Sequence, residues 1–442
     1  MSIKKENPKV DFVKNEHEIL DYWSKNKTFE KLVEKNSNGP KWSFLDGPIT
    51  ANNPMGVHHA WGRTLKDLYQ RYKSMNGHQL RYQNGFDCQG LWVEIEVEKE
   101  LGIKSKKEVE DLGIEKFVNL CKERVEKFSE VQKDQSIRLG YWMDWDNSYF
   151  TMSEENNYAI WAFLKKLHED GKIYRGTDVV PWSGRSGTSY SQMEIIEGRK
   201  LTVHKGVFVK FPLKDKENEN ILIWTTTPWT LSSNIAVAVN KKINYAKIKV
   251  QDGSIYFVAE TNLKYQRLNK EFAEKKNWVD GVPKLKTLDQ IFKERGGYEI
   301  IEVIKGEKLI GLTYQGPFDH LEPQNSKGGY PIHDTSNLQD KSAIDCHIII
   351  DGGKDSEGND MVVEGEGTGF VHMAGGCGAI DNKICKKEGF VEISPIDNQA
   401  NFIQGFDFMS GLSVTDPETA QKIISNLKAV SYTHLRAHET GW

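Results

Sequence analysis

Two adjacent histidines, His58 and His59, follow a loop rich in Pro, Gly and Asn and begin a stretch with helical periodicity. The first turn of a helix has unpaired backbone N–H groups and the positive end of the dipole, so that phosphate and other anions bind there. Imidazole N–H groups could donate to the same anion. Residues 46–60 therefore indicate a phosphate site. The alternative is that the two histidines only cap the helix or pack at its start.

A run of hydroxyl side chains, Thr225, Thr226 and Thr227, lies directly before Pro228. Taken alone, this run is typical of an edge strand that ends at a proline, because threonine favours strands and proline is confined to edges and ends. The five cysteines are widely spread and form no CxxC pair. Their spacing argues against a disulfide scaffold and a ribbon-type zinc site, and it favours the reducing cytoplasm.

The elements that must position the histidines can be read from the surrounding pattern. The apolar stretch at residues 42–45 predicts a buried strand, and Asp46-Gly47-Pro48 predicts a turn. From Ala60, apolar residues recur every three or four positions and predict an amphipathic helix; they are Trp61, Leu65, Leu68, Tyr72 and Met75. Further helices are expected within 17–36, 107–139, 153–171 and 416–427, the third with Thr151 and Glu154 spaced as a capping box.

Beyond Trp182 the pattern changes from helical to strand-like. A Ser/Gly-rich stretch is followed by alternating or β-branched runs, which predict strands at 203–211, 221–227, 235–240, 245–250 and 254–260. Gly-rich turns continue to about residue 400. The chain therefore predicts an α/β domain up to about residue 180 and a β-rich domain after it.

Length and composition limit the classes of protein. A chain of 442 residues suggests two to four domains, and 38% hydrophobic residues are typical of a globular protein. The net charge of -4, from 59 basic and 63 acidic residues, gives no global attraction to a polyanion, so any contact with nucleic acid must use local patches. The N-terminus lacks a secretory signal, and no apolar run is long enough to span a bilayer. We expect a soluble cytoplasmic protein with no membrane contact.

Four segments resemble, in order and spacing, the class I isoleucyl-tRNA synthetases: DGPITANNPMGVHHA, NGFDCQGLWVE, LGYWMDWDNSYFTM and IWTTTPWTLSSNIAVAV. The resemblance covers about residues 15–425. It implies an α/β fold that consists of the first half of a Rossmann-like nucleotide-binding fold with an inserted β-rich editing domain. Residues 1–182 would form the catalytic half, 183–405 the editing domain and 406–430 its return segment. Residues 431–442 fit neither the family nor a preceding helix or strand, and we expect a non-native tail there.

The resemblance assigns the first motif to ATP. The family's HIGH signature falls on Gly56-Val57-His58-His59, so that only the second histidine is in place. It implies that His59 stabilises the charge that develops on the α-phosphate and on departing pyrophosphate, with Gly56 and Gly47 also against ATP. That His58 compensates for the missing histidine is a hypothesis, because its Cβ points roughly 100° around the helix from that of His59. Mg²⁺ is implied with ATP as its substrate complex.

The amino-acid site is implied in the same way. Asp87 matches the partner of the substrate α-ammonium, and Pro48 matches a position that lines the side-chain pocket, with a simple turn proline as the alternative. Gln89 and Trp92 depart from the family pattern beside Asp87. Where many relatives carry a cysteine pair for zinc, this chain has Ser183 and Ser186, and we predict no metal there because serine does not replace thiolate as a structural ligand.

The threonine run falls, by resemblance, on a hydrolytic editing pocket. Asn234 would be the usual polar partner of Thr225, Thr226 and Thr227, and GTGFVHMAGGCGAID places His372 and Asp381 on the family's histidine and aspartate. Asp381 would hold the ammonium of a wrongly attached amino acid, and the hydroxyls would place a water against the ester carbonyl. Ala374-Gly375 and Cys377 depart from the family pattern in this loop.

The implied function is the ATP-dependent attachment of isoleucine to its tRNA through isoleucyl-adenylate, with hydrolysis of tRNA mischarged with valine. Isoleucine, ATP and the tRNA for isoleucine would be the partners of a monomer. Complete relatives are over twice as long and no KMSKS-like string occurs, so we expect a truncated chain that cannot form the adenylate alone. The alternatives are a stand-alone aminoacyl-tRNA deacylase and a non-catalytic tRNA-binding relative. Valine or leucine as substrate is disfavoured, because those branches usually carry an arginine after the threonines.

Overall fold

The computed structural model describes residues 10–44, 46–198, 202–265, 286–332, 339–354, 358–430, 432 and 436–441. It divides the chain into two compact units, Met1–Arg175 and Gly176–Trp442. The division falls a few residues before the predicted boundary at 182/183. Side chains just after it bond within the second unit: the Thr177 hydroxyl lies 3.5 Å from Glu392 Oε2, and Trp182 Nε1 donates to the Asn398 carbonyl at 2.9 Å.

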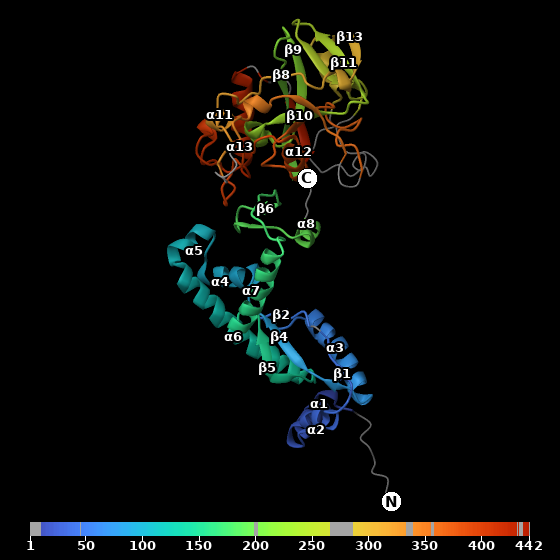
Figure 1. The fold of residues 1–442 in the computed structure, drawn as a ribbon, viewed down its shortest axis with the longest axis vertical. Coiled ribbons are helices and arrows are strands. Elements are labelled where there is room, and N and C mark those ends of the chain that lie inside the picture. Colours follow the sequence, from blue (N-terminus) through green and yellow to red (C-terminus); the bar gives the residue numbers. More distant parts are fainter. Residues whose placement is uncertain are drawn as a thin grey trace, which may run out of the picture. The chain divides into compact units, whose positions relative to one another are not determined.

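The first unit alternates helices with short strands (Figure 1). Its helices are α1 (Phe12–Lys25), α2 (Thr28–Lys35), α3 (Val57–Met75), α4 (Leu91–Leu101), α5 (Lys106–Leu112), α6 (Ile114–Arg138) and α7 (Glu154–Glu169). Its strands are β1 (Lys41–Trp42), β2 (Ile49–Thr50), β3 (Gln79–Leu80), β4 (Gln83–Asp87) and β5 (Asp144–Phe150). The strand expected at 42–45 covers only Lys41 and Trp42, and Leu45 lies outside the described residues.

The strands of the first unit pair in parallel. One sheet has the order β2-β4-β5, with Ile49 opposite Phe86 and Thr50 opposite Asp87, and β1 pairs with β3. Parallel neighbours need a crossover, here supplied by α3 between β2 and β4 and by α4 to α6 between β4 and β5. This topology confirms the predicted α/β, Rossmann-like class. It also places the carboxyl ends of β2 and β4 side by side, where Asp87 lies.

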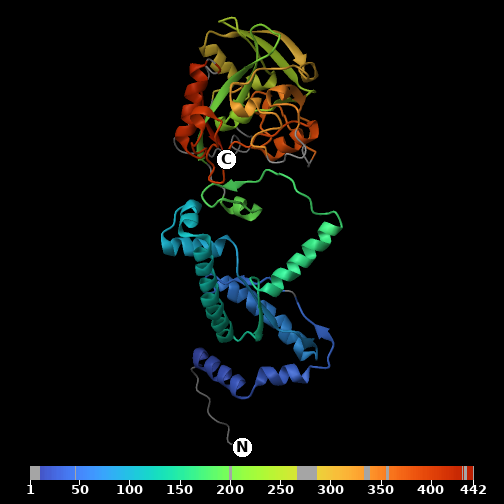
Figure 2. The same ribbon diagram turned by 60° about the vertical axis from the view of Figure 1, so that its left-hand side comes forward.

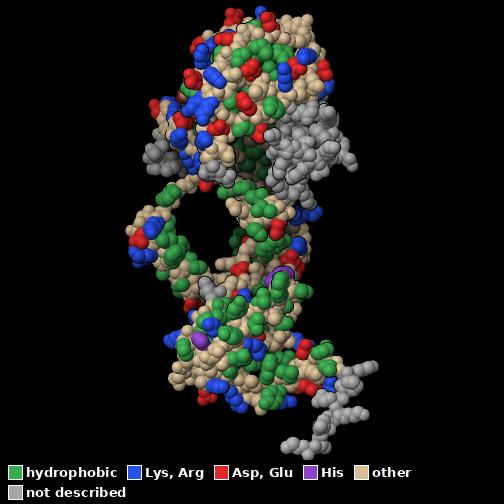
Figure 3. Space-filling model, turned by 90° about the vertical axis from the view of Figure 1, so that its right-hand side faces the viewer, with side chains coloured by type: hydrophobic (Ala, Val, Ile, Leu, Met, Phe, Trp, Pro, Cys, Tyr) green, Lys and Arg blue, Asp and Glu red, His purple; other side chains and the backbone are tan. Residues whose placement is uncertain are grey.

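Helix α3 is amphipathic as predicted, but its apolar face is not the buried one. Its apolar stripe is 47% to 80% exposed and consists of Trp61, Leu65, Leu68, Tyr72 and Met75. The residues that are buried on α3 are Arg63, Gln70 and Ser74. Exposed aromatic residues also occur on α7, at Tyr158, Trp161 and Phe163. Hydrophobic side chains, drawn in green, accordingly reach the surface of this unit (Figure 3).

The structure differs from the prediction in two of the expected helices. One is divided into two helices, and the other begins at a different N-cap residue. The stretch 17–36 is two helices, because Lys27 adopts a left-handed conformation with φ 50° between α1 and α2. The helix within 153–171 is α7, but its N-cap is Ser153, whose hydroxyl accepts from the Asn156 N–H at 3.3 Å. The predicted capping box of Thr151 and Glu154 is therefore wrong. The Thr151 hydroxyl instead accepts from the Cys88 N–H at 2.8 Å.

The second unit is rich in strands, as predicted. Its strands are β6 (Trp182–Ser183), β7 (Thr188–Ser189), β8 (Thr202–Pro212), β9 (Glu219–Thr225), β10 (Ala236–Val239), β11 (Asn244–Val250), β12 (Ile255–Ala259), β13 (Tyr298–Lys305), β14 (Ile349–Asp351), β15 (Val371–Met373) and β16 (Arg436–Gly441). Its α-helices are α8 (Gln192–Gly198), α10 (Leu288–Glu294), α11 (Glu322–Asn325), α12 (Ala379–Glu388) and α13 (Pro417–Ala429). Short 3-10 helices are η1 (Pro228–Ser233), η2 (Thr261–Leu263), η3 (Gly306–Lys308), η4 (Ile344–Cys346) and η5 (Asp407–Met409).

Two sheets enclose the core of the second unit. One has the order β13-β11-β12-β9-β8-β16, and the other has the order β14-β10-β15. The main hydrophobic cluster packs residues from Val207 in β8 to Leu427 in α13, and α13 lies beside β8 (Figure 2). The predicted strands of residues 203–260 thus form β8 to β12, because their alternating and β-branched runs supply this core. The helix expected at 416–427 is α13.

The segment that we expect to be a non-native tail contains a strand, and its non-native origin stays a prediction. Residues 436–441 form β16, which pairs antiparallel with β8 from Arg436 opposite Val207 to Gly441 opposite Thr202. Without β16, β8 would be an edge strand, and an edge strand offers unpaired backbone groups to any extended segment. Among the residues that the structure describes, no helix combines the length and apolarity needed to cross a bilayer.

Candidate functional site

The loop that precedes α3 is held by polar side chains of α6. Arg124 Nε donates to the Asn52 carbonyl at 2.9 Å, and Gln132 Nε2 donates to the carbonyls of Thr50 and Asn53 at 3.0 and 2.8 Å. The Met55 N–H donates to Gln135 Oε1 at 2.7 Å. Backbone groups from residue 50 to residue 55 are therefore fixed before the chain enters α3.

The predicted phosphate-binding residues meet at the first turn of α3. Gly56 is the N-cap, and its N–H donates to His59 Nδ1 at 3.1 Å. Burial, the neighbouring His58 and Arg63 lower the pKa of His59, which favours the neutral ring. Because Nδ1 accepts a hydrogen bond, the proton of the neutral ring lies on Nε2, which remains as a donor.

His58 lies close to both predicted ATP residues. Its ring centroid is 3.8 Å from that of His59. A Cβ added to Gly56 would lie 2.9 Å from His58 Cε1, so the His58 imidazole occupies the space that a side chain at position 56 would need. This geometry supports the hypothesis that His58 stands in for a residue that position 56 lacks. Gly47 is exposed in the turn before β2.

Asp87, at the end of β4, has both carboxylate oxygens held by hydroxyl groups. Thr50 Oγ1 donates to Oδ2 at 2.9 Å, and Thr151 Oγ1 lies 3.4 Å from Oδ1. Thr50 is the last residue of β2 and Thr151 directly follows β5. These two strands flank β4, so the parallel sheet itself brings the three residues together. Pro48 directly precedes β2 and is half-buried. The carboxylate is oriented and partly exposed, as a partner for a cation must be.

The threonine run, His372 and Asp381 line one cavity in the second unit. The cavity has a volume of about 360 Å³. It is lined by Trp224, Thr225, Thr226, Thr227, Thr230, Glu366, Gly367, Phe370, Val371, His372, Ala374, Cys377, Gly378 and Asp381. The end of β9, η1, β15 and the first turn of α12 supply Trp224, Thr225, Thr230, Val371, His372 and Asp381, and the loops beside these elements supply the others. Segments about 150 residues apart in the sequence thus converge on one site, as the predicted editing pocket requires.

Hydroxyl groups and the histidine are connected inside this cavity. The hydroxyl oxygens of Thr225 and Thr227 are 3.3 Å apart, and Thr230 Oγ1 lies 3.0 Å from His372 Nε2. The Thr230 hydroxyl also donates to the Thr227 carbonyl at 2.9 Å. Burial lowers the pKa of His372 to about 4, so its ring is neutral near pH 7. Because the single hydroxyl hydrogen of Thr230 is donated to the Thr227 carbonyl, the neutral imidazole donates its Nε2–H to Thr230 Oγ1.

Asp381 lies in the first turn of α12 and faces the cavity. The Ala374 N–H donates to its Oδ2 at 3.0 Å. Burial nevertheless raises the pKa of Asp381, because the low-polarity surroundings disfavour the charged form. A cationic group placed in the cavity would relieve this cost.

The sequence of the first unit and part of the second matches one family. Residues 18–306 match the family described as tRNA synthetases class I (I, L, M and V). The chain belongs to this family. The match confirms the resemblance that the four motifs indicate, and the fold of the chain follows the α/β class expected from them.

Curated relatives of this chain carry the name isoleucine–tRNA ligase. One from Clostridium tetani (strain Massachusetts / E88) is 34% identical over 98% of this chain and 37% of the relative. One from Pyrococcus horikoshii is 34% identical over 95% of this chain and 35% of the relative. The chain thus spans a little over a third of the length of these relatives. A solved ternary complex, Agrobacterium radiobacter K84 agnB2 LeuRS-tRNA-LeuAMS, is 12% identical over 96% of this chain and 47% of that chain, with a TM-score of 0.33.

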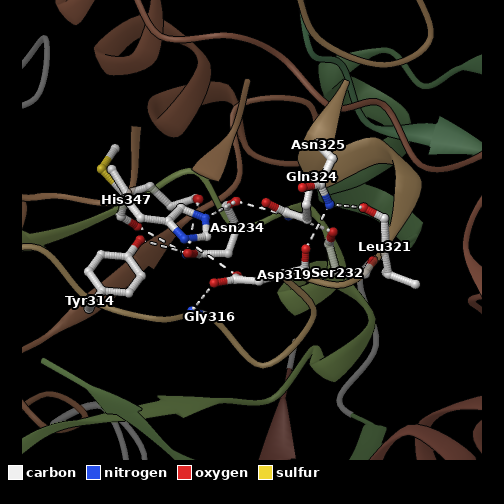
Figure 4. A network of polar contacts seen from close by, with 11 residues as sticks. Ser232, Asn234, Tyr314, Gly316, Asp319, Leu321, Gln324, Asn325 and His347 are labelled. Carbon is white, nitrogen blue, oxygen red and sulfur yellow. Dashed lines mark hydrogen bonds and ion pairs between the residues drawn. The ribbon is translucent and has the colours of Figure 1, made fainter. Parts of the chain in front are cut away.

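Asn234 is the one predicted editing residue that does not line the cavity. It is buried behind the cavity, where its Nδ2 donates to the carbonyls of Ala236 and Met373 at 3.1 and 3.5 Å. Its Oδ1 accepts from the Tyr314 hydroxyl at 2.6 Å (Figure 4). The side chain is therefore bonded to protein groups on both its oxygen and its nitrogen, and its role as the polar partner of the threonine run stays a prediction.

The serines predicted to replace zinc ligands form a small turn between β6 and β7. Ser183 is buried, and its Oγ accepts from the Ser186 N–H at 3.2 Å, a bond that closes the turn. Within the described ranges, no group of three or more His, Cys, Asp or Glu side chains has a geometry that could hold a metal ion.

Several residues of both sites were not predicted from the sequence. Thr151 beside Asp87 lies in the motif LGYWMDWDNSYFTM, but its position suggested a helix cap. The spacing of Arg124, Gln132 and Gln135 could have indicated a shared role. Polar residues that are eight and then three positions apart lie on one face of a helix. Glu366 in the cavity lies in a Gly-rich turn with no chemical pattern. Only tertiary contacts bring these residues to the sites.

Proposed function

We propose that this chain is part of an isoleucine–tRNA ligase in which residues 176–442 hydrolyse tRNA that carries the wrong amino acid. The observation that supports it is the convergence of Thr225, Thr226, Thr227, His372 and Asp381 on one cavity, in a chain of the class I synthetase family. The curated relatives named isoleucine–tRNA ligase support isoleucine as the amino acid.

The chemistry of the cavity fits hydrolysis of an aminoacyl ester. The polar partner of Asp381 is a backbone N–H, so the α-ammonium of an aminoacyl group would supply the cation that the buried carboxylate lacks. The hydroxyls of Thr225 and Thr227 can hold a water against the ester carbonyl. His372, neutral near pH 7, can orient the Thr230 hydroxyl without adding a charge.

Such a cavity would select the amino acid to be hydrolysed by its size. A hydrophobic site separates isoleucine from valine by only about 1–3 kcal/mol, so that a second site which admits valine and rejects isoleucine improves fidelity. A cavity of about 360 Å³ is of the size in which one added methyl group can decide entry.

The first unit would contribute to the formation of isoleucyl-adenylate from ATP, bound with Mg²⁺, and isoleucine. The first turn of α3 offers unpaired N–H groups together with the Nε2–H of His59, which suits a phosphate. Asp87, oriented by Thr50 and Thr151, suits the α-ammonium of isoleucine. The tRNA for isoleucine as partner, the cytoplasm as compartment and a monomer as the state belong to the same proposal.

Hydrolysis of tRNA for isoleucine charged with valine tests the editing function. We expect the chain to release valine, and we expect Asp381→Ala to lower the rate by about 100-fold or more, because the substrate cation loses its buried partner. Asp345→Ala is the matched control, since Asp345 lies in the same unit but does not line the cavity. Hydrolysis retained in Asp381→Ala would reject the role of Asp381, and an inactive parent chain would reject editing by these residues.

A stand-alone deacylase is a second candidate function. It is favoured by one observation: every residue that lines the cavity lies between Trp224 and Asp381, inside the second unit. Isoleucine-dependent exchange of pyrophosphate into ATP, measured on the protein at its full length, separates the two candidates, because a deacylase has no adenylation step. A full-length protein that neither exchanges pyrophosphate nor hydrolyses valyl-tRNA would be a non-catalytic tRNA-binding relative.

A further inference from the structure

A buried polar network lies directly behind the cavity and has Asn234 at its centre. The side chain of Gln324, from α11, donates through Nε2 to the carbonyls of Ser232 and Asn234 at 2.9 and 3.1 Å. The Tyr314 hydroxyl donates to Asn234 Oδ1 at 2.6 Å, and His347 Nε2 lies 3.3 Å from the Asn234 carbonyl. Figure 4 shows these side chains pointing toward Asn234 from three separate segments.

The outer part of the network consists of a contact between a histidine and a carboxylate, and of stacked rings. His347 Nδ1 lies 3.5 Å from Asp319 Oδ1, and Asp319 Oδ2 accepts from the Gly316 N–H at 3.0 Å. The ring of Tyr314 stacks on His347 at 5.0 Å on one side and on Phe211 at 5.2 Å on the other. Tyr314 is fully buried, and burial raises its pKa well above the ordinary value, so the hydroxyl keeps its proton. Its hydrogen bond to Asn234 is thus a fixed feature of the fold.

The residues that this network bonds are close in the sequence to residues that line the cavity. Ser232 belongs to η1, the same short helix that supplies Thr230. Asn234 Nδ2 and the Ile235 N–H both donate to the Met373 carbonyl, at 3.5 and 2.8 Å, and Met373 directly follows His372 in β15. The network therefore connects η1 to β15, and these two elements carry the pair Thr230 and His372, whose polar atoms are 3.0 Å apart.

We propose that Tyr314, Gln324 and the His347–Asp319 pair are positioning residues that set the width of the cavity between Thr230 and His372 and so determine which amino acid is hydrolysed. This inference rests on the proposed editing function. None of these four residues lines the cavity, and their effect passes through Asn234 and the backbone of η1 and β15.

The physical basis is that the network is buried and connects two elements that lie far apart in the sequence. A buried acceptor that loses its donor is costly, so the surrounding backbone moves to find another partner. When the Tyr314 hydroxyl is removed, Asn234 Oδ1 loses its 2.6 Å bond while the stacked rings still fill their space. A small separation of η1 from β15 then widens the cavity, and a group one methylene larger gains entry.

The test compares two substrates in the full chain: tRNA for isoleucine charged with valine and the same tRNA charged with isoleucine. In Tyr314→Phe we expect the preference for valine over isoleucine to fall by about fivefold or more, mainly because the hydrolysis of isoleucyl-tRNA rises. Gln324→Met, which keeps the volume of the side chain and removes both donated bonds, should act in the same direction.

Tyr298→Phe is the matched control. Its hydroxyl donates to Asp289 Oδ1 at 2.8 Å in the same unit, and neither residue lines the cavity. A preference that is unchanged in both Tyr314→Phe and Gln324→Met overturns the inference. An equal loss of the hydrolysis rates for valyl-tRNA and isoleucyl-tRNA also overturns the inference, because a unit that is only destabilised loses both activities. A parent chain that does not hydrolyse valyl-tRNA would instead reject the proposed function, and the inference with it.

Discussion

Burial and local hydrogen bonding shift the pKa of Asp381 in opposite directions. The Ala374 N–H and the first turn of α12 favour the charged form, since the N-terminal end of a helix attracts negative charge. Burial disfavours the charged form and is the larger effect, so the pKa of Asp381 is raised. An acid whose pKa is higher in the folded chain than in the unfolded chain makes folding less favourable as the pH rises between the two values.

We therefore expect Asp381→Asn to lose hydrolysis but to gain stability relative to the parent chain near pH 7. The asparagine cannot ionise, so it avoids the cost of a buried charge, and the gain should shrink to nothing as the pH falls below about 4. The free energy of unfolding of the second unit, measured in urea at several pH values, checks this expectation.

Asp345→Asn is expected to change stability near pH 7 in the opposite direction. The Ser342 N–H and hydroxyl both donate to the Asp345 carboxylate at 2.8 and 2.9 Å, and these bonds lower its pKa. The stabilisation is present above the unfolded-state pKa and is lost as the pH falls. Asp345→Asn should thus be less stable than the parent near pH 7. If both variants shifted stability in the same direction with pH, burial would not be the cause at Asp381.

At the scale of elements, α6 holds the loop that precedes α3. Arg124, Gln132 and Gln135 lie on one face of α6, and each bonds to the backbone between residues 50 and 55. Ala51 at the start of this loop is buried in an apolar cluster, and these hydrogen bonds hold the residues around it up to the first turn of α3. Loops held by few contacts open locally long before the whole unit unfolds.

Gln132→Leu should loosen this loop without unfolding the unit. The change leaves the Thr50 and Asn53 carbonyls without their donor, at a cost of about 1–3 kcal/mol. We expect amide hydrogen exchange within residues 50–56 to accelerate by about tenfold or more, as measured by mass spectrometry. Glu130→Gln, an exposed position on the same helix, should leave the exchange unchanged. An unchanged rate in Gln132→Leu would show that α6 does not hold the loop.

In helix α3, the apolar face that the sequence spacing predicts is not the face that is buried. The spacing of Trp61, Leu65, Leu68, Tyr72 and Met75 correctly predicts a helix, because apolar residues at three- and four-residue steps share a face. It does not say which face packs on the rest of the unit. Arg63 is buried instead, with its guanidinium against the ring of Tyr141 and one N–H donated to Asn84 Oδ1 at 3.0 Å. Only the tertiary contacts reveal this arrangement.

At the scale of the whole chain, each unit has its own hydrophobic clusters. The main cluster of the second unit extends from Val207 to Leu427, and a further cluster packs α10 against β11 and β12. Those of the first unit lie between Phe29 and Phe150. A unit with its own core can fold as a domain.

We expect residues 176–442 to fold and to hydrolyse valyl-tRNA without residues 1–175. All residues that line the cavity, and the network behind it, lie in this unit. Thermal unfolding followed by circular dichroism should show one cooperative transition for residues 176–442, and the rate of deacylation should remain within about threefold of that of the whole chain. A non-cooperative transition would mean that the first unit is needed for folding.

Much of the fold follows from patterns that act over short distances. Alternation and β-branched runs predict β8 to β12, and helical spacing predicts α3 and α13, since each pattern reports which residues of one element face the same way. Helical spacing does not predict two breaks. Lys27, with φ 50°, divides the helix expected within 17–36, and Gly113, with φ 99°, separates α5 from α6 in the stretch 107–139. Spacing reports which residues share a face and not the backbone conformation of a single residue.

The sequence by itself determined the family, the class of fold and the residues that meet in the cavity, because motif order and residue type carry that information through resemblance. The tertiary structure alone decided that Asn234 lies behind the cavity, that Thr151 orients Asp87 and that α3 packs through its polar face. The physical reason is the same in each case. A polar side chain bonds to whichever partner folding brings within about 3 Å, and that partner lies tens of residues away in the chain.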